Sequence, residues 1–180
     1  AQKEKMDSWI DVAERIGCKN TVLAESFSDY KKLIELRYKL PEKVNSYFKK
    51  LGWHKIAIDA AVPEEKFSKL YKFYKNVQKE NPKLKTVIFG HIGESHLHFN
   101  LFPKDEEQKE LVEKVYIESI KKAVSLGGTG FAEHGIGKTK NKYLRYMYSQ
   151  EAIFEMVKIK KIFDPQLILG IGNIFPREFI

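Results

Sequence analysis

The chain has 180 residues, enough for one domain, or at most one and a half, with a buried core. Hydrophobic residues make up 43% and aromatic residues 13%, which is typical of a globular protein and excludes a disordered chain. The apolar runs are too short to cross a bilayer, so the sequence predicts no transmembrane segment. Cys18 is the single cysteine, which excludes an internal disulfide and favours a reducing compartment. We therefore expect a cytoplasmic protein, with peripheral membrane attachment through partners left open.

The net charge of +8 and the pI near 9.3 are compatible with nucleic-acid binding. The lysines, however, are spread over nearly every helical segment as the polar partners of apolar stripes. A lysine-rich solvated surface explains them better, so we expect no nucleic-acid partner.

The first fifty residues are predicted to be mainly helical. Apolar residues recur at helical spacing over residues 6–16, and Gly17 is a suitable C-terminal stop. Residues 21–24 are a short strand candidate. Ser28 is a candidate cap for a second helix, which Pro41 is expected to kink or restart.

Strands and helices alternate through the rest of the chain. The expected elements are a strand at 55–62, a helix between Pro63 and Pro82, strands at 85–89 and 96–102, a helix from an Asp105–Gln108 capping box to Gly127, and a helix from a Ser149 cap to Asp164. The two strands on either side of residues 90–93 are too close in sequence for a parallel crossover. We therefore expect an α+β fold with a mixed, largely antiparallel sheet covered by helices.

Four of the five histidines lie in two glycine-bracketed segments, residues 90–100 and 127–137. In the second segment His134 follows directly after Glu133. Imidazoles and a carboxylate that converge suit either a divalent metal or proton transfer. The alternatives are histidines on a solvent-facing strand and a flexible loop with an incidental Glu-His pair.

Strand geometry predicts how the first segment presents its side chains. Residues two apart share a face, so His96, His98 and Asn100 project together, and the intervening apolar residues point to the core. If the strand continued back to His91, that side chain would point to the opposite face, because it is an odd number of residues from His96 and His98. The glycines on either side of His91 allow a bend that re-aims its side chain.

The order and spacing of three motifs resemble the C-terminal domain of FAD-linked oxidases of the vanillyl-alcohol oxidase type. The motifs are GHIGESHLHFN at 90–100, AEHGIGK at 132–138 and FDPQLIL at 163–169. The resemblance is to the group of D-lactate dehydrogenase, glycolate oxidase and D-2-hydroxyglutarate dehydrogenase, and it runs roughly from residues 33–37 to the end. It implies a ferredoxin-like sheet.

The resemblance further implies a flavin-dependent 2-hydroxy-acid dehydrogenase with a small 2-hydroxy acid as substrate. Residues 1–180 would form a single substrate or cap domain that supplies the catalytic base. Nothing here resembles the FAD-binding domain of the family, so we expect FAD to be held mainly by a domain or subunit outside this chain. The alternatives are a truncated, non-catalytic relative that acts as a binding or structural subunit, and a metal hydrolase.

Carried over by position, the resemblance assigns three kinds of role. His134 matches the base that takes the substrate's hydroxyl proton while a hydride passes to FAD. His91, His98 and Glu133 match ligands of a divalent metal (Zn, Mn or Fe). Arg37 and Asn100 match substrate contacts. Lys55 lies two residues from a family lysine position and is a further candidate for contact with the substrate.

The sequence departs from the family pattern in two places. Where the family has Asp-Gly-Asn, this chain has Glu94, Ser95 and His96, which would alter the turn or add His96 as a further metal ligand. Near the C-terminus, residues 170–173 replace Asn-Pro-Gly-Lys and remove a lysine.

A basic stretch follows the Glu-His pair. It would neutralise the substrate or the flavin phosphates, or it is a solvated stretch, which we favour. Its members are Lys138, Lys140, Lys142 and Arg145.

Overall fold

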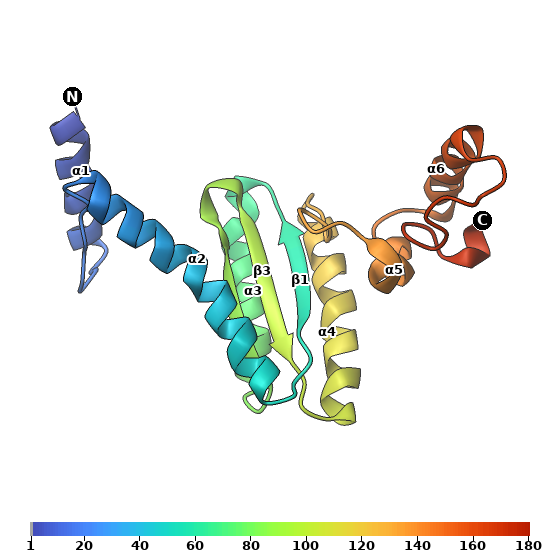
Figure 1. Ribbon diagram of the computed structural model, residues 1–180, viewed down its shortest axis with the longest axis horizontal. Coiled ribbons are helices and arrows are strands. Elements are labelled where there is room, and N and C mark those ends of the chain that lie inside the picture. Colours follow the sequence, from blue (N-terminus) through green and yellow to red (C-terminus); the bar gives the residue numbers. More distant parts are fainter. Residues whose placement is uncertain (1) are drawn as a thin grey trace. The chain divides into compact units, whose positions relative to one another are not determined.

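A computed structural model describes residues 2–180, with side chains from residue 5 onward. The chain forms two units, Ala1–Tyr47 and Phe48–Ile180. The first unit contains α1 (Gln2–Arg15) and most of α2 (Phe27–Lys50). The second contains the sheet and the remaining helices (Figure 1).

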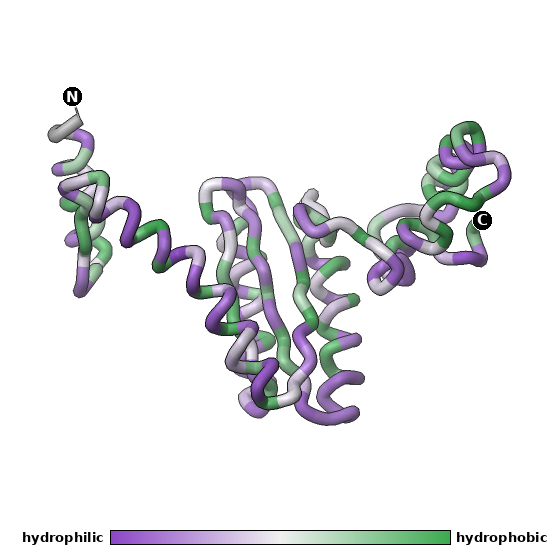
Figure 2. The backbone as a smooth tube through the Cα atoms, viewed as in Figure 1, coloured by the Kyte–Doolittle hydropathy of each residue, from purple (hydrophilic) through white to green (hydrophobic). Residues whose placement is uncertain are grey.

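The first unit is helical, as predicted, with two corrections. Residues 21–24 form no strand, because an isolated apolar segment has no ladder partner here to accept its hydrogen bonds. The cap of α2 is Ser26, not Ser28: the Ser26 hydroxyl accepts the Asp29 N–H at 3.1 Å. Pro41 lies inside α2, which continues without a restart. Hydrophilic and hydrophobic residues alternate along α2 (Figure 2), as in an amphipathic helix.

The second unit is built on a three-stranded antiparallel sheet of order β1-β3-β2. Its strands are β1 (Ile56–Ala61), β2 (Lys85–His91) and β3 (His96–Phe102). The α+β, largely antiparallel fold that the sequence predicts is confirmed. Among the described residues, the parallel contribution is an isolated bridge between Asp59 and Phe131.

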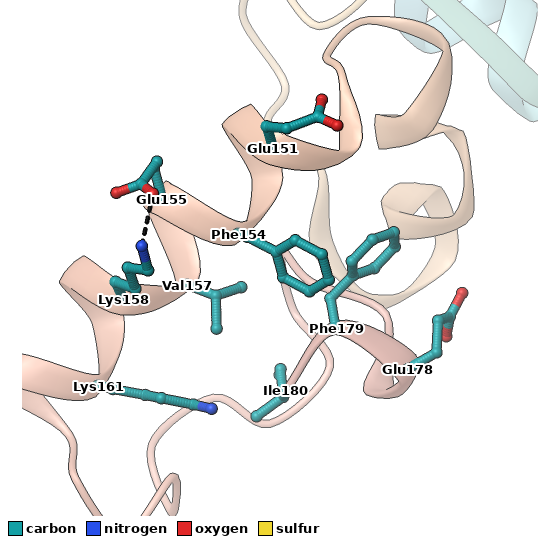
Figure 3. A pocket seen from close by; sticks show the side chains of 9 residues that line it. All are labelled: Glu151, Phe154, Glu155, Val157, Lys158, Lys161, Glu178, Phe179 and Ile180. Carbon is teal, nitrogen blue, oxygen red and sulfur yellow. Dashed lines mark hydrogen bonds and ion pairs between the residues drawn. The ribbon is translucent and has the colours of Figure 1, made fainter.

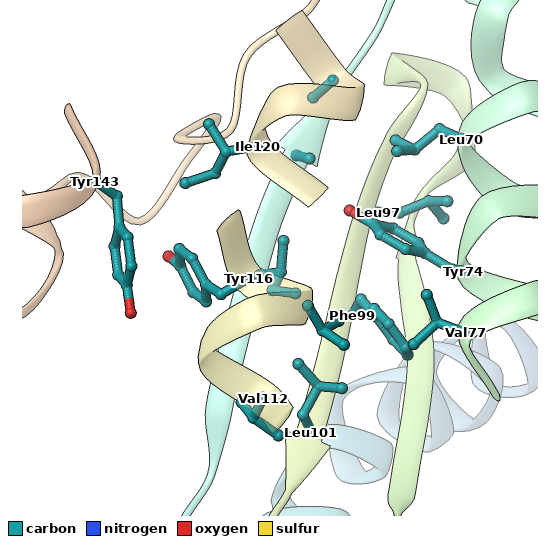
Figure 4. Packing of buried hydrophobic residues seen from close by; sticks show 14 of the residues in the cluster. Leu70, Tyr74, Val77, Leu97, Phe99, Leu101, Val112, Tyr116, Ile120 and Tyr143 are labelled. Atoms are coloured by element: carbon teal, nitrogen blue, oxygen red, sulfur yellow. The ribbon is translucent and has the colours of Figure 1, made fainter. Parts of the chain in front are cut away.

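Helices α3 (Phe67–Glu80) and α4 (Glu106–Ser125) cover one face of this sheet (Figure 1). The apolar residues of β3 alternate with its polar ones, so Leu97, Phe99 and Leu101 all point to this face and are buried. Figure 4 shows them packed against side chains from both helices. The contacting helical residues are Leu70, Tyr74 and Val77 from α3, and Val112, Tyr116 and Ile120 from α4.

Two predicted caps begin the helices that follow the sheet. The Asp105 carboxylate accepts the Gln108 N–H at 2.9 Å at the start of α4. The Ser149 hydroxyl accepts the Ala152 N–H at 3.2 Å at the start of α6 (Gln150–Phe163). Between these helices lie α5 (Gly137–Lys140) and a 3₁₀ segment, η3 (Asn141–Tyr146); the other 3₁₀ segments are η1 (Glu64–Lys66), η2 (Ile92–Glu94) and η4 (Arg177–Phe179).

A smaller apolar cluster, centred on Leu144, Ile153, Val157 and Phe175, holds α6 to the C-terminal segment. Of the helices in the described part of the chain, none combines the length and apolar character needed to span a membrane.

Candidate active site

The register of the sheet brings the histidines together. His91 on β2 pairs with His96 on β3, and Asp59 on β1 pairs with His98. Directly opposed residues of antiparallel strands present their side chains on the same face. The predicted bend is present, but it lies after His91: the 3₁₀ turn η2 (Ile92–Glu94), which contains Gly93, reverses the chain, while β2 extends through His91 and pairs it with His96.

The tight connection between β2 and β3 depends on its backbone. A Cβ on Gly90 would lie 2.2 Å from the His96 carbonyl oxygen, so only glycine allows β3 to approach this closely. Ser95, where the family has glycine, adopts a left-handed conformation (φ +50°, ψ +35°). The turn therefore uses a left-handed residue without a glycine there, and His96 follows in register.

The loop after α4 runs along the outer edge of β1. Thr129 and Ala61 exchange two backbone hydrogen bonds of 2.8 and 3.1 Å, and the Ala132 N–H donates to the Asp59 carbonyl oxygen at 3.0 Å. A Cβ on Gly128 would meet the Ala61 carbonyl oxygen at 2.1 Å, so this close approach also requires glycine. The edge pairing places the Glu133-His134 pair beside the histidines of the sheet.

Three imidazoles converge on one carboxylate oxygen. His91 Nε2 lies 3.2 Å, His98 Nε2 3.6 Å and His96 Nδ1 3.7 Å from Glu133 Oε2. Ligand atoms of these four residues all lie within 4.8 Å of one another. His96 and His98 are buried, whereas 52% of the Glu133 side chain is exposed, so the histidine cluster is reached from the Glu133 side.

His134 lies on the same side of the histidine cluster. Its ring centroid is 5.0 Å from that of His98, and the residue is exposed. The structure thus brings the proposed base, His134, next to the proposed ligands, as the sequence predicted for residues 127–137.

Asp59 is the member of the site that sequence reasoning missed. Its side chain is fully buried, and Oδ1 lies 2.5 Å from His96 Nε2 and 3.2 Å from His98 Nδ1. Oδ2 accepts the backbone N–H groups of Glu133 at 2.9 Å and His134 at 2.7 Å. A signal was available, since Asp59 is the lone charged residue within an apolar strand, where a carboxylate needs partners.

The surroundings lower the pKa values of two groups in the site, Asp59 and His98, for different reasons. Burial alone would raise the pKa of Asp59, but hydrogen bonds from the His134 and Glu133 N–H groups and from His96 outweigh it and lower the pKa to about 2. Burial, together with neighbouring His96, lowers the pKa of His98. His98 is therefore held in the neutral form, which is the form that binds a metal.

The three predicted substrate residues lie in different places. Asn100 is on the same face of β3 as His98, buried, with Nδ2 3.3 Å from the His98 carbonyl oxygen and 3.5 Å from that of Val87. Lys55 precedes β1, four residues from Asp59, which is roughly 13 Å along a strand. Burial lowers the pKa of the Lys55 amine. Arg37 is on α2 in the first unit, its guanidinium carbon 5.5 Å from the centroid of the Tyr38 ring.

Two members of the basic stretch are paired with acidic side chains of this chain. Lys142 Nζ lies 2.8 Å from Glu113 Oε1, and Arg145 Nη2 lies 3.7 Å from Glu178 Oε1. Both pairs are at the surface, which agrees with the solvated alternative for these two residues.

A separate hollow lies between α6 and the C-terminal segment (Figure 3). Apolar side chains such as Phe154 and Phe179 line it, with an ion pair between Glu155 and Lys158 (2.6 Å) at its rim. It has no converging imidazoles or carboxylates comparable to those around Glu133, so we place the chemistry at the histidine cluster.

Comparison with known proteins identifies the family. The model of the family described as FAD linked oxidases, C-terminal domain, matches residues 1–174. The chain belongs to this family. The match confirms the resemblance seen in the sequence and extends it toward the N-terminus, beyond the residues 33–37 from which it had been traced.

Relatives of known name match parts of this chain at modest identity. The chain is 32% identical over 122 residues to the glycolate oxidase subunit GlcD of Bacillus subtilis, covering 67% of this chain and 26% of that protein. It is 38% identical over 101 residues to a D-2-hydroxyglutarate dehydrogenase of Stutzerimonas stutzeri (52% and 21%). It is 32% identical over 127 residues to the mitochondrial D-lactate dehydrogenase [cytochrome] of Arabidopsis thaliana (69% and 22%). The chain thus spans about a quarter or less of the length of these relatives.

Proposed function

We propose that this chain is the substrate-binding and catalytic-base domain of an FAD-dependent 2-hydroxy-acid dehydrogenase. The observation that carries the proposal is the convergence of three imidazole nitrogens on Glu133 Oε2, with His134 adjacent. The names of the relatives support a small 2-hydroxy acid as substrate. Because the matched residues cover about a quarter or less of those proteins, we propose that FAD is held mainly by a domain or subunit outside these residues.

The donor set fits a divalent metal. His91, His98 and Glu133 provide two imidazole nitrogens and a carboxylate oxygen, which suit Zn²⁺, Mn²⁺ or Fe²⁺. His96 Nδ1 faces the same point and is a fourth candidate ligand, a role that the asparagine of the family pattern fills poorly. A divalent ion, when bound, lowers the pKa of a coordinated hydroxyl and orients the substrate oxygens.

His134 is suited to move the proton. Loss of hydride from the α-carbon becomes easier as the hydroxyl loses its proton, so a base must lie within hydrogen-bond reach. The exposed imidazole of His134 is on the side from which the histidine cluster is reached. FAD, held by that other domain or subunit, would supply the hydride acceptor.

Arg37, Asn100 and Lys55 are proposed to hold the substrate. A planar guanidinium matches a carboxylate with two parallel hydrogen bonds, which suits Arg37 for the acid group. Asn100 lies on the face of the sheet that carries His98, so among the three its amide is the candidate next to the histidine cluster.

The test is flavin reduction followed by stopped-flow absorbance in the flavin-loaded enzyme, with D-lactate, glycolate and D-2-hydroxyglutarate. His134→Ala should lower the reduction rate by about 10²–10⁴, the loss expected for a general base, with a much smaller change in substrate affinity. His54→Ala is the matched control, because His54 is exposed and outside the histidine cluster. A normal rate and pH profile in His134→Ala would make His134 structural. Failure of all three acids to reduce the flavin would favour the non-catalytic alternative.

A further inference from the structure

The fully buried carboxylate of Asp59 has more partners than loop closure needs. Oδ2 alone accepts both the Glu133 and the His134 N–H groups. Oδ1 is left to face the imidazoles of His96 and His98. Asp59 therefore links the strand that carries the histidines to the loop that carries the Glu-His pair.

These contacts indicate which nitrogen of His96 carries a proton. An oxygen that receives two N–H groups belongs to a carboxylate acting as acceptor, so the short contact of 2.5 Å at Oδ1 is donated by His96 Nε2. A neutral imidazole with its proton on Nε2 has its lone pair on Nδ1. In His96 that nitrogen faces Glu133 Oε2, at 3.7 Å.

His98 is arranged in the opposite sense. Its Nδ1 lies 3.2 Å from Asp59 Oδ1, in poor alignment for a hydrogen bond, and its Nε2 faces Glu133 Oε2 at 3.6 Å. With Nδ1 turned to an acceptor, the lone pair of a neutral His98 is on Nε2. The two rings thus present different nitrogens, and both point to the same place.

We propose that Asp59 is the positioning residue of this centre: one oxygen fixes the tautomer of His96 so that Nδ1 is presented as a ligand, and the other holds the peptide that carries Glu133 and His134. The ligand role of Nδ1 rests on the proposed metal site; the tautomer does not. Asp59 also belongs to a second group of candidate ligands, with His98 and His134; we assign it the positioning role because both of its oxygens already have hydrogen-bond partners within the chain. Carboxylates that orient metal-binding histidines typically contribute 10- to 100-fold to metal affinity.

Asp59→Asn tests the proposal sharply, because an amide has one acceptor end. If the amide oxygen faces the two loop N–H groups, its NH₂ group faces His96 Nε2, which must then become an acceptor. His96 switches to the Nδ1–H tautomer and loses the lone pair that faces Glu133. Asp164→Asn is the matched control, since Asp164 is also buried and also accepts two backbone N–H groups, but has no histidine partner.

The measurement is two-bond ¹⁵N–¹H NMR on ¹⁵N-histidine-labelled protein without metal, with the His96 signals assigned from His96→Gln. We expect the Nε2–H tautomer in the wild type and in Asp164→Asn, and the Nδ1–H tautomer in Asp59→Asn. Zn²⁺ calorimetry should show 10- to 100-fold weaker binding in Asp59→Asn alone.

An Nδ1–H tautomer of His96 in the wild type overturns the proposal, even if Asp59→Asn does not fold. An unchanged tautomer in folded Asp59→Asn also overturns it. A wild type that has the Nε2–H tautomer but binds no Zn²⁺ contradicts the metal site under "Proposed function" and leaves the positioning role of Asp59 supported.

Discussion

Two buried aspartates in the second unit close loops in the same way, but only one of them lies among histidines. Asp164 follows α6 and accepts two consecutive backbone N–H groups, with Lys160 as its third partner at 2.6 Å. Asp59 lies in the middle of β1 and also accepts two consecutive N–H groups, but its third partner is His96 at 2.5 Å.

The comparison separates a structural device from a functional one. A carboxylate that accepts loop N–H groups stabilises the loop, whichever side chain is its third hydrogen-bond partner. A lysine partner supplies only its positive charge, whereas an imidazole has a second nitrogen, whose protonation state and direction the carboxylate fixes. The third partner of the aspartate therefore distinguishes the site near β1 from the loop after α6, and variants in the two regions should differ accordingly.

The largest contrast is expected in metal binding. His98→Ala removes a ligand nitrogen that lies 3.6 Å from Glu133 Oε2, so Zn²⁺ affinity should fall by at least about 100-fold, more than for loss of an orienting carboxylate. Isothermal titration calorimetry of the purified protein measures it. His54→Ala should bind as the wild type does. Equal affinity in all three proteins would show that the histidine cluster holds no metal.

The next contrast is in stability. Asp59→Ala leaves two loop N–H groups and the buried His96 ring without their acceptor, which should cost about 3 kcal/mol. Asp164→Ala should cost less, about 1–2 kcal/mol, because Lys160 keeps a second acceptor, the Leu169 carbonyl oxygen at 2.9 Å. Urea unfolding of the metal-free proteins measures both free energies. A cost for Asp164→Ala equal to or above that for Asp59→Ala would contradict the argument.

A pH contrast follows from the pKa of Asp59, which is lowered from 3.8 to about 2 in the folded protein. A lowered folded-state pKa stabilises above the unfolded value and loses that contribution as pH falls from about 4 through 2. The contribution is about 2 kcal/mol at neutral pH. With chelator present, the stability lost between pH 5 and pH 2 should therefore be about 2 kcal/mol smaller in Asp59→Asn than in the wild type. Identical pH profiles would show that Asp59 is not held ionised.

Local signals in the sequence predicted much of this fold. The bounds of β3 and the caps at Asp105 and Ser149 agree with the structure, because alternation and capping act over a few residues. The cap of α2 was misplaced by two residues: α2 begins at Phe27, so Ser28 lies inside its first turn, and the Ser26 hydroxyl accepts the Asp29 N–H. The strand at 21–24 was wrong because β-propensity without a neighbouring strand forms no ladder.

The candidate site was only partly predictable for a different reason. Its histidines share two short segments, so the sequence could indicate that they converge. The pairing of His91 with His96, however, is set by the register between β2 and β3. The contact of Asp59 with His96 joins residues 37 positions apart through pairing of β1 with β3, which no local pattern encodes.

The smallest contrast concerns two residues that adopt positive φ without being glycine, one in each region. Ser95 (φ +50°) precedes β3, and Leu167 (φ +53°) lies in the loop that Asp164 closes. A left-handed conformation costs a residue with a Cβ about 1 kcal/mol, so Ser95→Gly and Leu167→Gly should each stabilise the protein by up to about 1 kcal/mol, measured by urea unfolding.

Substitutions at the two positions should differ in their effect on metal binding. Ser95 adjoins His96, and the family pattern has glycine at this position, so Ser95→Gly should keep the turn and the Zn²⁺ affinity. Ser95→Val disfavours positive φ, so it should lower both the stability and the Zn²⁺ affinity. Leu167→Val should lower stability alone. A loss of Zn²⁺ affinity in Leu167→Val would mean that the two regions are coupled, and the contrast between them would fail.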